Sequence, residues 1–321
     1  MYKSLFFGGR EMNYLLLFVG FILLIKGADI FVEGSSNIAK FFKIPTIIIG
    51  LTLVAFGTSA PEAAVSITAS LNKSADLSVS NIIGSNIFNL FVVLGITSLF
   101  KDVVTEKEVI KKDYMLALFS SIILLVLIFA NYFIKGSLML NRIGGAILLI
   151  VLIYYLVNLV KNVDSSKKVV EERKLSIKDI IFIIVGLACV ILGGNLTVNA
   201  ATEIARTFGM SERFIGLTIV AIGTSLPELC TSLVALLKGE NDIAVGNVIG
   251  SNIFNILFIL GATSLINPML INIESVIDLM ILVVASIILL IFGFDDLKLK
   301  KKEGICMLLF YIAYCVYIFI R

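Results

Sequence analysis

Long apolar segments alternate with short charged or glycine- and proline-containing connections along nearly the whole chain. Ten such segments lie at residues 13–40, 45–72, 78–100, 113–134, 142–161, 177–206, 212–238, 243–266, 274–294 and 303–320. About 20 apolar residues are enough for a helix to cross a bilayer, and uniformly apolar runs lack the period-two alternation of a half-buried strand. The pattern therefore predicts an all-α polytopic membrane protein with ten transmembrane helices.

The composition supports a membrane protein and excludes several other classes. Of 321 residues, 59% are hydrophobic and 15% are charged, whereas soluble domains are about half apolar and a quarter charged. The net charge is only +3, and no basic stripe interleaved with aromatic residues indicates a nucleic-acid partner. Histidine is absent, which excludes histidine zinc motifs and Ser-His-Asp triads. We predict no enzyme, no cofactor and no obligate protein partner.

The two halves of the chain repeat each other at a constant offset of 166 residues. Between residues 47–99 and 213–265, about 29 of 53 positions are identical without a gap. We therefore divide the chain into a first five-helix repeat at 13–161, a polar linker at 162–176 and a second five-helix repeat at 177–320. Because each repeat has an odd number of spans, the second enters the membrane from the opposite side and the repeats are inverted.

The distribution of basic residues sets the predicted orientation. Connections on one side of the predicted helices carry about 17 Lys and Arg residues, and those on the other side, with the termini, carry about 8. The positive-inside rule then places both termini outside the cell and the 161–178 loop in the cytoplasm of a plasma-membrane protein.

One polar segment interrupts the second predicted helix, and its repeat interrupts the seventh. Gly57-Thr-Ser-Ala-Pro-Glu62 matches Gly223-Thr-Ser-Leu-Pro-Glu228. Proline lacks a backbone N–H and clashes with the preceding turn, so both helices are expected to break near mid-membrane. A carboxylate at that depth costs about 2.5–3.5 kcal/mol on insertion scales. Two at equivalent positions indicate function rather than accident.

Further polar side chains recur on the third and eighth predicted helices. Ser85 and Asn89 lie four residues apart, and Ser251 and Asn255 repeat them. Every group in this set offers oxygen, which suits hard cations such as Ca²⁺ or Na⁺. Polar residues in spans can also simply hold helices together, and we favour that interpretation for Asn86 and Asn252.

A separate charged set lies on the first predicted helix. Lys26, Asp29 and Glu33 have helical spacing, and their equivalents in the second repeat are uncharged. We expect these three side chains to neutralise one another rather than to bind ions.

The paired G-T-S-x-P-E and G-S-N-x-x-N segments resemble the signature repeats of the calcium/cation antiporter superfamily, in particular its prokaryotic sodium/calcium exchangers. The resemblance implies a fold of two inverted five-helix repeats, and exchange of one Ca²⁺ for three Na⁺ by alternating access. Glu62 and Glu228 would bind Ca²⁺ with the carbonyls of Thr58 and Thr224. Flanking Na⁺ sites would use Ser59, Ser225, Ser85, Ser251 and the carbonyls of Ala55 and Ala221, with Asn89 and Asn255 completing the middle. Asn255 departs from the aspartate of several relatives, and it either keeps the site at two negative charges or only orients a glutamate.

Other functions use similar residues. Proton-coupled calcium exchangers of the same superfamily resemble one another in a G-N-x-x-E-H pattern. At those positions this chain has Gly84-Ser85 and Gly250-Ser251, and it has no histidine. A cation channel could use the same acids, although broken helices in inverted repeats are typical of carriers. An intramembrane enzyme lacks a visible nucleophile–base pair.

Overall fold

A computed structural model describes residues 4–72, 75–161, 176–210, 221–293 and 297–320. Within these residues, eight helices are long and apolar enough to cross a membrane, or nine when one bent pair counts as a span. The start of the seventh predicted helix and nearly all of the linker predicted at 162–176 lie outside the described residues. The chain is therefore a helical multi-pass membrane protein, as the apolar segments predict.

The first half contains five groups of helical segments. They are α1 (Ser4–Phe42); α2 (Thr46–Ile49), α3 (Ala55–Thr58) and α4 (Ala60–Leu71); α5 (Ala75–Phe88) and α6 (Leu94–Phe100); α7 (Lys107–Val109) and α8 (Met115–Lys135); and α9 (Arg142–Lys161). Short π-helical segments, η1 (Gly50–Val54), η2 (Asn89–Val93) and η3 (Ile110–Tyr114), join the pieces within a group. α1 begins earlier than residue 13, where the apolar pattern placed it.

The second half follows the same plan. Its helices are α10 (Ile177–Thr207), α12 (Ala221–Thr224), α13 (Leu226–Leu237), α14 (Asn241–Phe254), α15 (Gly261–Ile266), α16 (Ile273–Ile288) and α17 (Lys301–Ile320). The π-helical segments η6 (Asn255–Leu260) and η7 (Leu289–Gly293) extend α14 and α16. The described connections contain four two-residue strands: β1 (Val103–Val104), β2 (Met139–Leu140), β3 (Met269–Leu270) and β4 (Lys298–Leu299).

The polar G-T-S-x-P-E segments coincide with interruptions between helices. Ser59 separates α3 from α4 with φ −77° and ψ 4°, and the helices on its two sides are bent by 48°. Ser225 separates α12 from α13 with a similar backbone, φ −93° and ψ 7°. Pro61 and Pro227 lie in the first turn after each interruption, where a missing N–H leaves no helical bond unmade.

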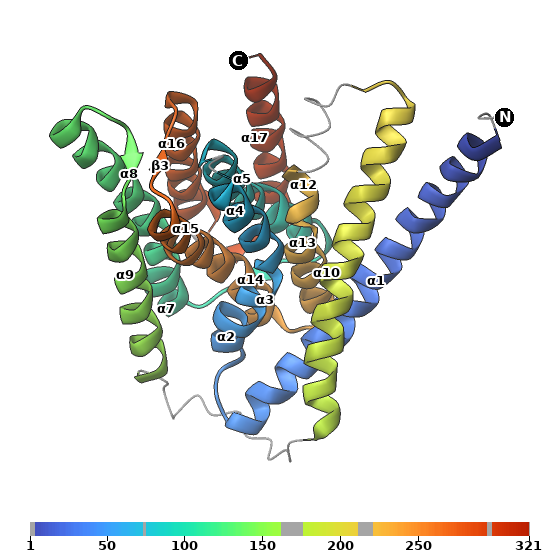
Figure 1. The fold of residues 1–321 in the computed structure, drawn as a ribbon. Helices are drawn as coiled ribbons and strands as arrows, with labels where there is room; N and C mark the ends of the chain where they lie inside the picture. The colour runs from blue at the N-terminus through green and yellow to red at the C-terminus, as the bar shows by residue number, and fades with distance from the viewer. Residues whose placement is uncertain (1–3, 73–74, 162–175, 211–220, 294–296, 321) are drawn as a thin grey trace.

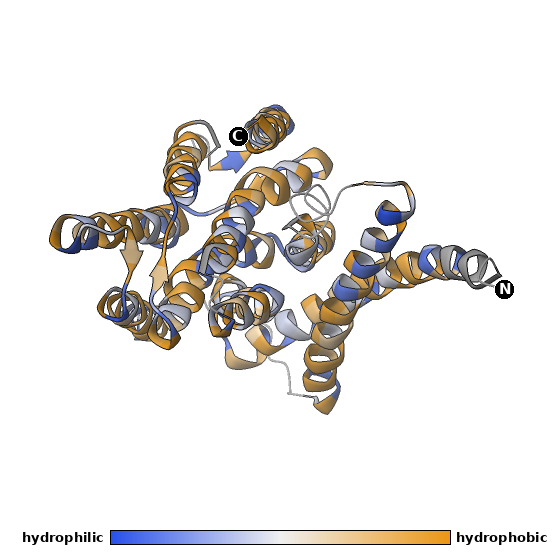
Figure 2. Ribbon diagram, turned by 45° about the horizontal axis from the view of Figure 1, so that its top comes forward, coloured by the Kyte–Doolittle hydropathy of each residue, from blue (hydrophilic) through white to orange (hydrophobic). Residues whose placement is uncertain are grey.

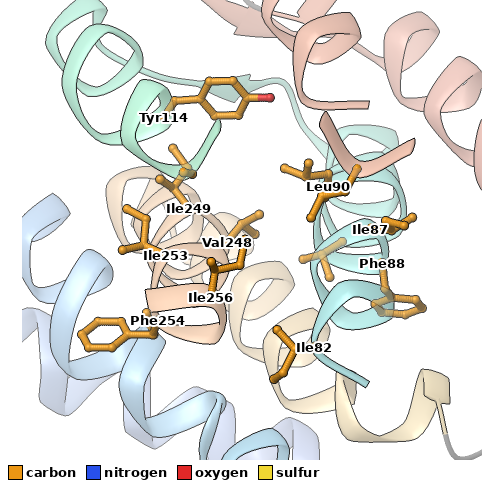
Figure 3. Packing of buried hydrophobic residues seen from close by; sticks show 14 of the residues in the cluster. Ile82, Ile87, Phe88, Leu90, Tyr114, Val248, Ile249, Ile253, Phe254 and Ile256 are labelled. Atoms are coloured by element: carbon orange, nitrogen blue, oxygen red, sulfur yellow. The ribbon is translucent and has the colours of Figure 1, made fainter. Parts of the chain in front are cut away.

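Two helices form the centre of the molecule and the others surround them. In an apolar stretch of 18 residues, 83% are buried in the α5–α6 span and 94% in the α14–α15 span. The same measure is 17–44% for the six peripheral spans. Aliphatic side chains of α5 and α14, such as Ile87 and Ile253, pack between these central helices and their neighbours (Figure 3). The central pair is thus shielded from lipid by protein.

The peripheral helices present apolar side chains outward. Large hydrophobic residues such as Ile153 on α9 and Leu309 on α17 are about 60% exposed, and hydrophobic positions run along most of the length of these helices (Figure 2). Burying such faces in lipid rather than water is favourable, so these helices contact the bilayer.

α1 and α10 form a separate pair beside the bundle (Figure 1). Their glycines permit very close packing: a Cβ on Gly27 would lie 2.9 Å from the Gly186 carbonyl oxygen, and one on Gly193 would lie 2.8 Å from that of Gly20. Small residues let helix backbones approach closely in membranes. The first turns of α1 and the last turns of α17 lie toward the top of Figure 1, and the end of α9 and the start of α10 lie at the bottom.

Candidate functional site

Two buried glutamates lie just after the interruptions between α3 and α4 and between α12 and α13. Glu62 is in the first turn of α4 and Glu228 is in the first turn of α13. Both side chains are 0% exposed. The helix N-termini direct their backbone N–H groups toward this region, which favours negative charge there. The structure therefore holds both predicted carboxylates inside the protein rather than at its surface.

The hydroxyl groups around the glutamates come from both repeats. Ser59, which precedes α4, donates to Oε1 of Glu228 over 3.2 Å. Its equivalent Ser225, which precedes α13, lies 3.2 Å from Oε1 of Glu62. Ser85 of α5 also donates to Oε1 of Glu62 over 3.2 Å. Each serine beside a helix break thus contacts the glutamate of the other repeat, a crossing that one-dimensional spacing did not predict.

Four oxygens at this centre are buried without a hydrogen-bond partner among the described residues. They are Oε2 of Glu62, Oε2 of Glu228, Oδ1 of Asn89 and Oδ1 of Asn255. An unpaired buried carboxylate oxygen is costly, and buried charges are normally paired or bound to metal ions. The four oxygens form two equivalent pairs under the 166-residue offset. Carboxylate and amide oxygens are the ligands that hard cations prefer.

The two asparagines also mark a change of helix type. Asn89 begins η2 and Asn255 begins η6. Asn89 Nδ2 donates to Asn252 Oδ1 over 3.2 Å, and Asn255 Nδ2 donates to Asn86 Oδ1 over 2.9 Å and to Ser85 Oγ over 3.2 Å. π-Helical turns occur often at functional sites. Asn255 contacts Glu62 through Ser85, whose hydroxyl accepts from the Asn255 amide and donates to Glu62 Oε1.

Asn86 and Asn252 tie the central helices together. Asn86 Nδ2 donates to the Asn252 carbonyl over 3.2 Å, and Asn252 Nδ2 donates to the Asn86 carbonyl over 3.4 Å. This reciprocal pair joins α5 to α14, as we expected of residues that hold helices together.

The remaining predicted residues are only partly placed. Ser251 donates to the Ala55 carbonyl over 3.4 Å, and Thr58 Oγ1 lies 3.4 Å from Ser251 Oγ. These three groups therefore gather on the α3 side of the centre. Thr224 is buried, whereas the side chain of Ala221 lies outside the described residues.

One buried residue at the centre was not assigned a role from the sequence. Asn247 of α14 accepts a hydrogen bond from Thr58 Oγ1 over 2.9 Å. It also donates to the Glu228 carbonyl over 3.3 Å and to Ser232 Oγ over 2.9 Å. Asn247 thus holds α3 and α13 in one arrangement around Glu228. Its recurrence as Asn81 in the repeat was the available signal.

The charged set on α1 has a different partner from the expected one. Lys238, directly after α13, pairs with Asp29 at 2.7 Å and with Glu33 at 3.5 Å. Local neutralisation among Lys26, Asp29 and Glu33 is therefore wrong, because helix packing brings a lysine from the other repeat closer.

Comparison with known proteins agrees with this picture. The sequence profile described as "Sodium/calcium exchanger protein" matches residues 12–161 and 178–320. The sodium/calcium exchanger MaX1 of Methanosarcina acetivorans is 32% identical over 346 residues, which cover 96% of this chain and 99% of that protein. The inner membrane protein YrbG of Escherichia coli is 37% identical over 269 residues, 79% of each chain.

The fold also matches a solved transporter. The structure of the sodium-calcium exchanger NCX_Mj soaked with Na⁺ and Ca²⁺ superposes with a TM-score of 0.81 at 34% identity, covering 94% of this chain and 97% of that one. MaX1 and NCX_Mj are named as sodium/calcium exchangers, so these two relatives are transporters rather than enzymes. With the profile matching nearly the whole chain, the protein belongs to the sodium/calcium exchanger family.

Proposed function

We propose that this protein is a secondary antiporter that exchanges Na⁺ for Ca²⁺ across the membrane. The observation that carries the proposal is the pair of fully buried glutamates whose Oε2 atoms have no hydrogen-bond partner within the described part of the chain, accompanied by two asparagine oxygens in the same condition. A Ca²⁺ ion would use such oxygens and balance the two negative charges. The relatives named for sodium/calcium exchange support this choice of ions.

Competition for shared ligands would couple the two ions. On one side of the site, Glu62 would bind ions together with Ser85 and Ser225, which contact its carboxylate. On the other side, Glu228 would bind ions together with Ser59. In the proposed scheme, Thr58, Thr224, Ala55 and Ala221 contribute carbonyls, and Ser251, Asn89 and Asn255 complete the set. Because the same carboxylates neutralise either Ca²⁺ or Na⁺, one load must leave before the other binds. Antiport follows from that exclusion.

Exchange of three Na⁺ for one Ca²⁺ would be electrogenic. Two carboxylates balance one Ca²⁺, whereas three Na⁺ leave one net positive charge in the loaded carrier. Each net charge moved through the membrane couples to about 2.3 kcal/mol per 100 mV. The membrane potential would therefore contribute to the driving force for Ca²⁺ movement.

We also propose the finer architecture of ten spans in two inverted repeats. Reciprocal contacts support a pseudo-twofold relation: β1 pairs with β4 while β3 pairs with β2, and Ser59 and Ser225 exchange glutamates. Inverted repeats with broken helices at mid-membrane are typical of carriers that expose one site alternately to each side. The close glycine packing of α1 and α10 would let this pair slide as a unit along the bundle.

The proposed orientation places both termini outside the cell and the linker in the cytoplasm. The basic residues of the connections, about 17 against 8, support it. The start of α1 and the end of α17 lie toward the opposite end of the molecule from the end of α9 and the start of α10 (Figure 1), which supports this topology. The plasma membrane is the proposed location.

Uptake of ⁴⁵Ca²⁺ into proteoliposomes separates the main proposal from a proton-coupled exchanger. We expect rapid uptake when the vesicles contain Na⁺ and the bath does not. Uptake should be faster when the vesicle interior is positive, because three Na⁺ leaving for one Ca²⁺ entering carry one net positive charge out. A proton gradient alone, or a K⁺ gradient alone, should give no more uptake than protein-free liposomes. Uptake driven by protons without Na⁺ would instead establish the proton-coupled alternative.

A further inference from the structure

Equivalent faces of α4 and α13 are covered unequally. On α13, the side chains of Leu226, Cys230 and Val234 pack against a buried cluster that includes Leu24 and Ala28 of α1. The equivalents of Cys230 and Val234 on α4 are Ala64 and Thr68, at the 166-residue offset, and both are exposed. They line an open cavity of about 400 Å³. α1 therefore covers this face of α13, whereas the equivalent face of α4 is left exposed.

An ionic contact lies at the end of the covered face. Lys238 Nζ is 2.7 Å from Asp29 Oδ1 and 3.5 Å from Glu33 Oε2, and it donates to the Asp29 carbonyl over 2.9 Å. One turn further along α1, Ser36 Oγ donates to Oε1 of Glu240 over 2.5 Å. Three side chains of α1 and two of the α13–α14 junction thus join these elements at the end of the molecule where α10 begins.

The opposite half of the molecule lacks these charges. The equivalent of Lys238 is Asn72, and the equivalents of Asp29 and Glu33 are Asn195 and Asn199. The equivalent of Ser36 is Thr202, whose hydroxyl has no hydrogen-bond partner among the described residues. A repeat duplication alone would give equal contacts at both ends, so the ionic contact distinguishes one end from the other.

We propose that Lys238, Asp29 and Glu33 form a latch that favours the conformation in which α1 covers α13. The inference rests on the proposed alternating access, in which α1 and α10 slide against the bundle. Sliding that uncovers α13 must separate Lys238 from both acids, whereas sliding that covers α4 forms no equivalent ion pair. The three side chains are 30–44% exposed, so the pair is weakened by solvent and can open reversibly. A modest contact of this kind shifts a two-state population without locking it.

Distances between spin labels test the latch without measuring transport. In a background with Cys189, Cys230, Cys306 and Cys315 replaced by serine, one label pair at Ile25→Cys and Leu237→Cys follows the separation of α1 from α13. A second pair at Leu192→Cys and Leu71→Cys follows α10 and α4. All four positions are exposed. Double electron–electron resonance on protein in nanodiscs then gives the population of each conformation.

We expect Lys238→Asn, which copies Asn72, to lower the ratio of α13-covered to α13-open protein by about threefold to tenfold. Asp29→Asn should do the same to a smaller extent, because Glu33 remains. The exchanged pair Lys238→Asp with Asp29→Lys, made together with Glu33→Gln so that the new aspartate does not face a glutamate, should restore most of the ratio. Arg206→Asn is the matched control, since it breaks the exposed Arg206–Glu203 pair within α10 and should leave both distances unchanged.

Identical distance distributions in the original protein, Lys238→Asn and Asp29→Asn would overturn the latch. A shift that the exchanged pair fails to reverse would also overturn it, because the effect would then come from packing rather than from charge. These outcomes are independent of ion selectivity. A latch response in a protein without Na⁺-driven Ca²⁺ uptake would refute the proposed exchange and leave the latch standing.

Discussion

Glu62→Gln and Glu228→Gln are each expected to reduce Na⁺-driven ⁴⁵Ca²⁺ uptake to the level of protein-free liposomes. Glutamine keeps an oxygen that can accept from Ser85 or Ser59, so the hydrogen bonds at Oε1 can persist. It removes one of the two charges that would balance Ca²⁺. A charge left uncompensated at the centre of a membrane costs about 2.5–3.5 kcal/mol, which corresponds to roughly a hundredfold loss of affinity.

The two variants should fold normally, because replacing a buried carboxylate by an amide eases its burial. Size-exclusion profiles and thermal unfolding curves should therefore match those of the original protein. Glu203→Gln is the control: this glutamate is exposed on α10 and pairs with Arg206, so its exchange rate should be unchanged. Normal exchange in either buried variant would exclude that glutamate from the ion site and contradict a site built on two carboxylates.

Asn255→Asp is expected to make Ca²⁺ exchange depend on K⁺, whereas the original protein should be K⁺-independent. Asn255 is fully buried, and its Nδ2 faces Asn86 Oδ1 at 2.9 Å. Asn86 cannot reverse its amide without losing its own bond to the Asn252 carbonyl. An aspartate would therefore place a carboxylate against an acceptor, one hydroxyl away from Glu62. A third negative charge beside the site can hold an additional monovalent cation.

The measurement is Na⁺-driven ⁴⁵Ca²⁺ flux with K⁺ or with an equal concentration of choline. Asn89→Asp provides the comparison at the equivalent position, where the amide faces Asn252 Oδ1 instead. If only local repulsion matters, both variants should lose activity regardless of K⁺. If the original protein already requires K⁺, two neutral amides do not set the charge of the site as proposed.

The sequence predicted the residues of the site better than it predicted the contacts between them. Paired proline-containing motifs located Glu62 and Glu228, because a carboxylate in an apolar helix is costly and its repetition is visible in one dimension. The crossing of Ser59 to Glu228 and of Ser225 to Glu62 could not be read in this way. It depends on how two segments 166 residues apart pack against each other.

Helix details and long-range charges were hidden for related reasons. The π-helical turns at Asn89 and Asn255 insert one residue into an otherwise regular pattern, and apolar periodicity within a fully buried helix is too uniform to reveal them. Helical spacing on α1 suggested local neutralisation, but Lys238 lies closer to Asp29 once α1 packs on α13. Local rules fail where tertiary contacts supply a better partner.

Competition between Na⁺ and Ca²⁺ for the purified protein tests most directly whether the buried oxygens form one shared site. Equilibrium binding of ⁴⁵Ca²⁺ in nanodiscs would be measured while Na⁺ replaces choline at constant ionic strength, with K⁺ replacing choline in parallel. We predict saturable Ca²⁺ binding that Na⁺ displaces more steeply than one ion for one and that K⁺ leaves unchanged, with no saturable binding in Glu62→Gln. Saturable Ca²⁺ binding that persists at saturating Na⁺, or that survives in Glu62→Gln, would contradict a shared site at these glutamates.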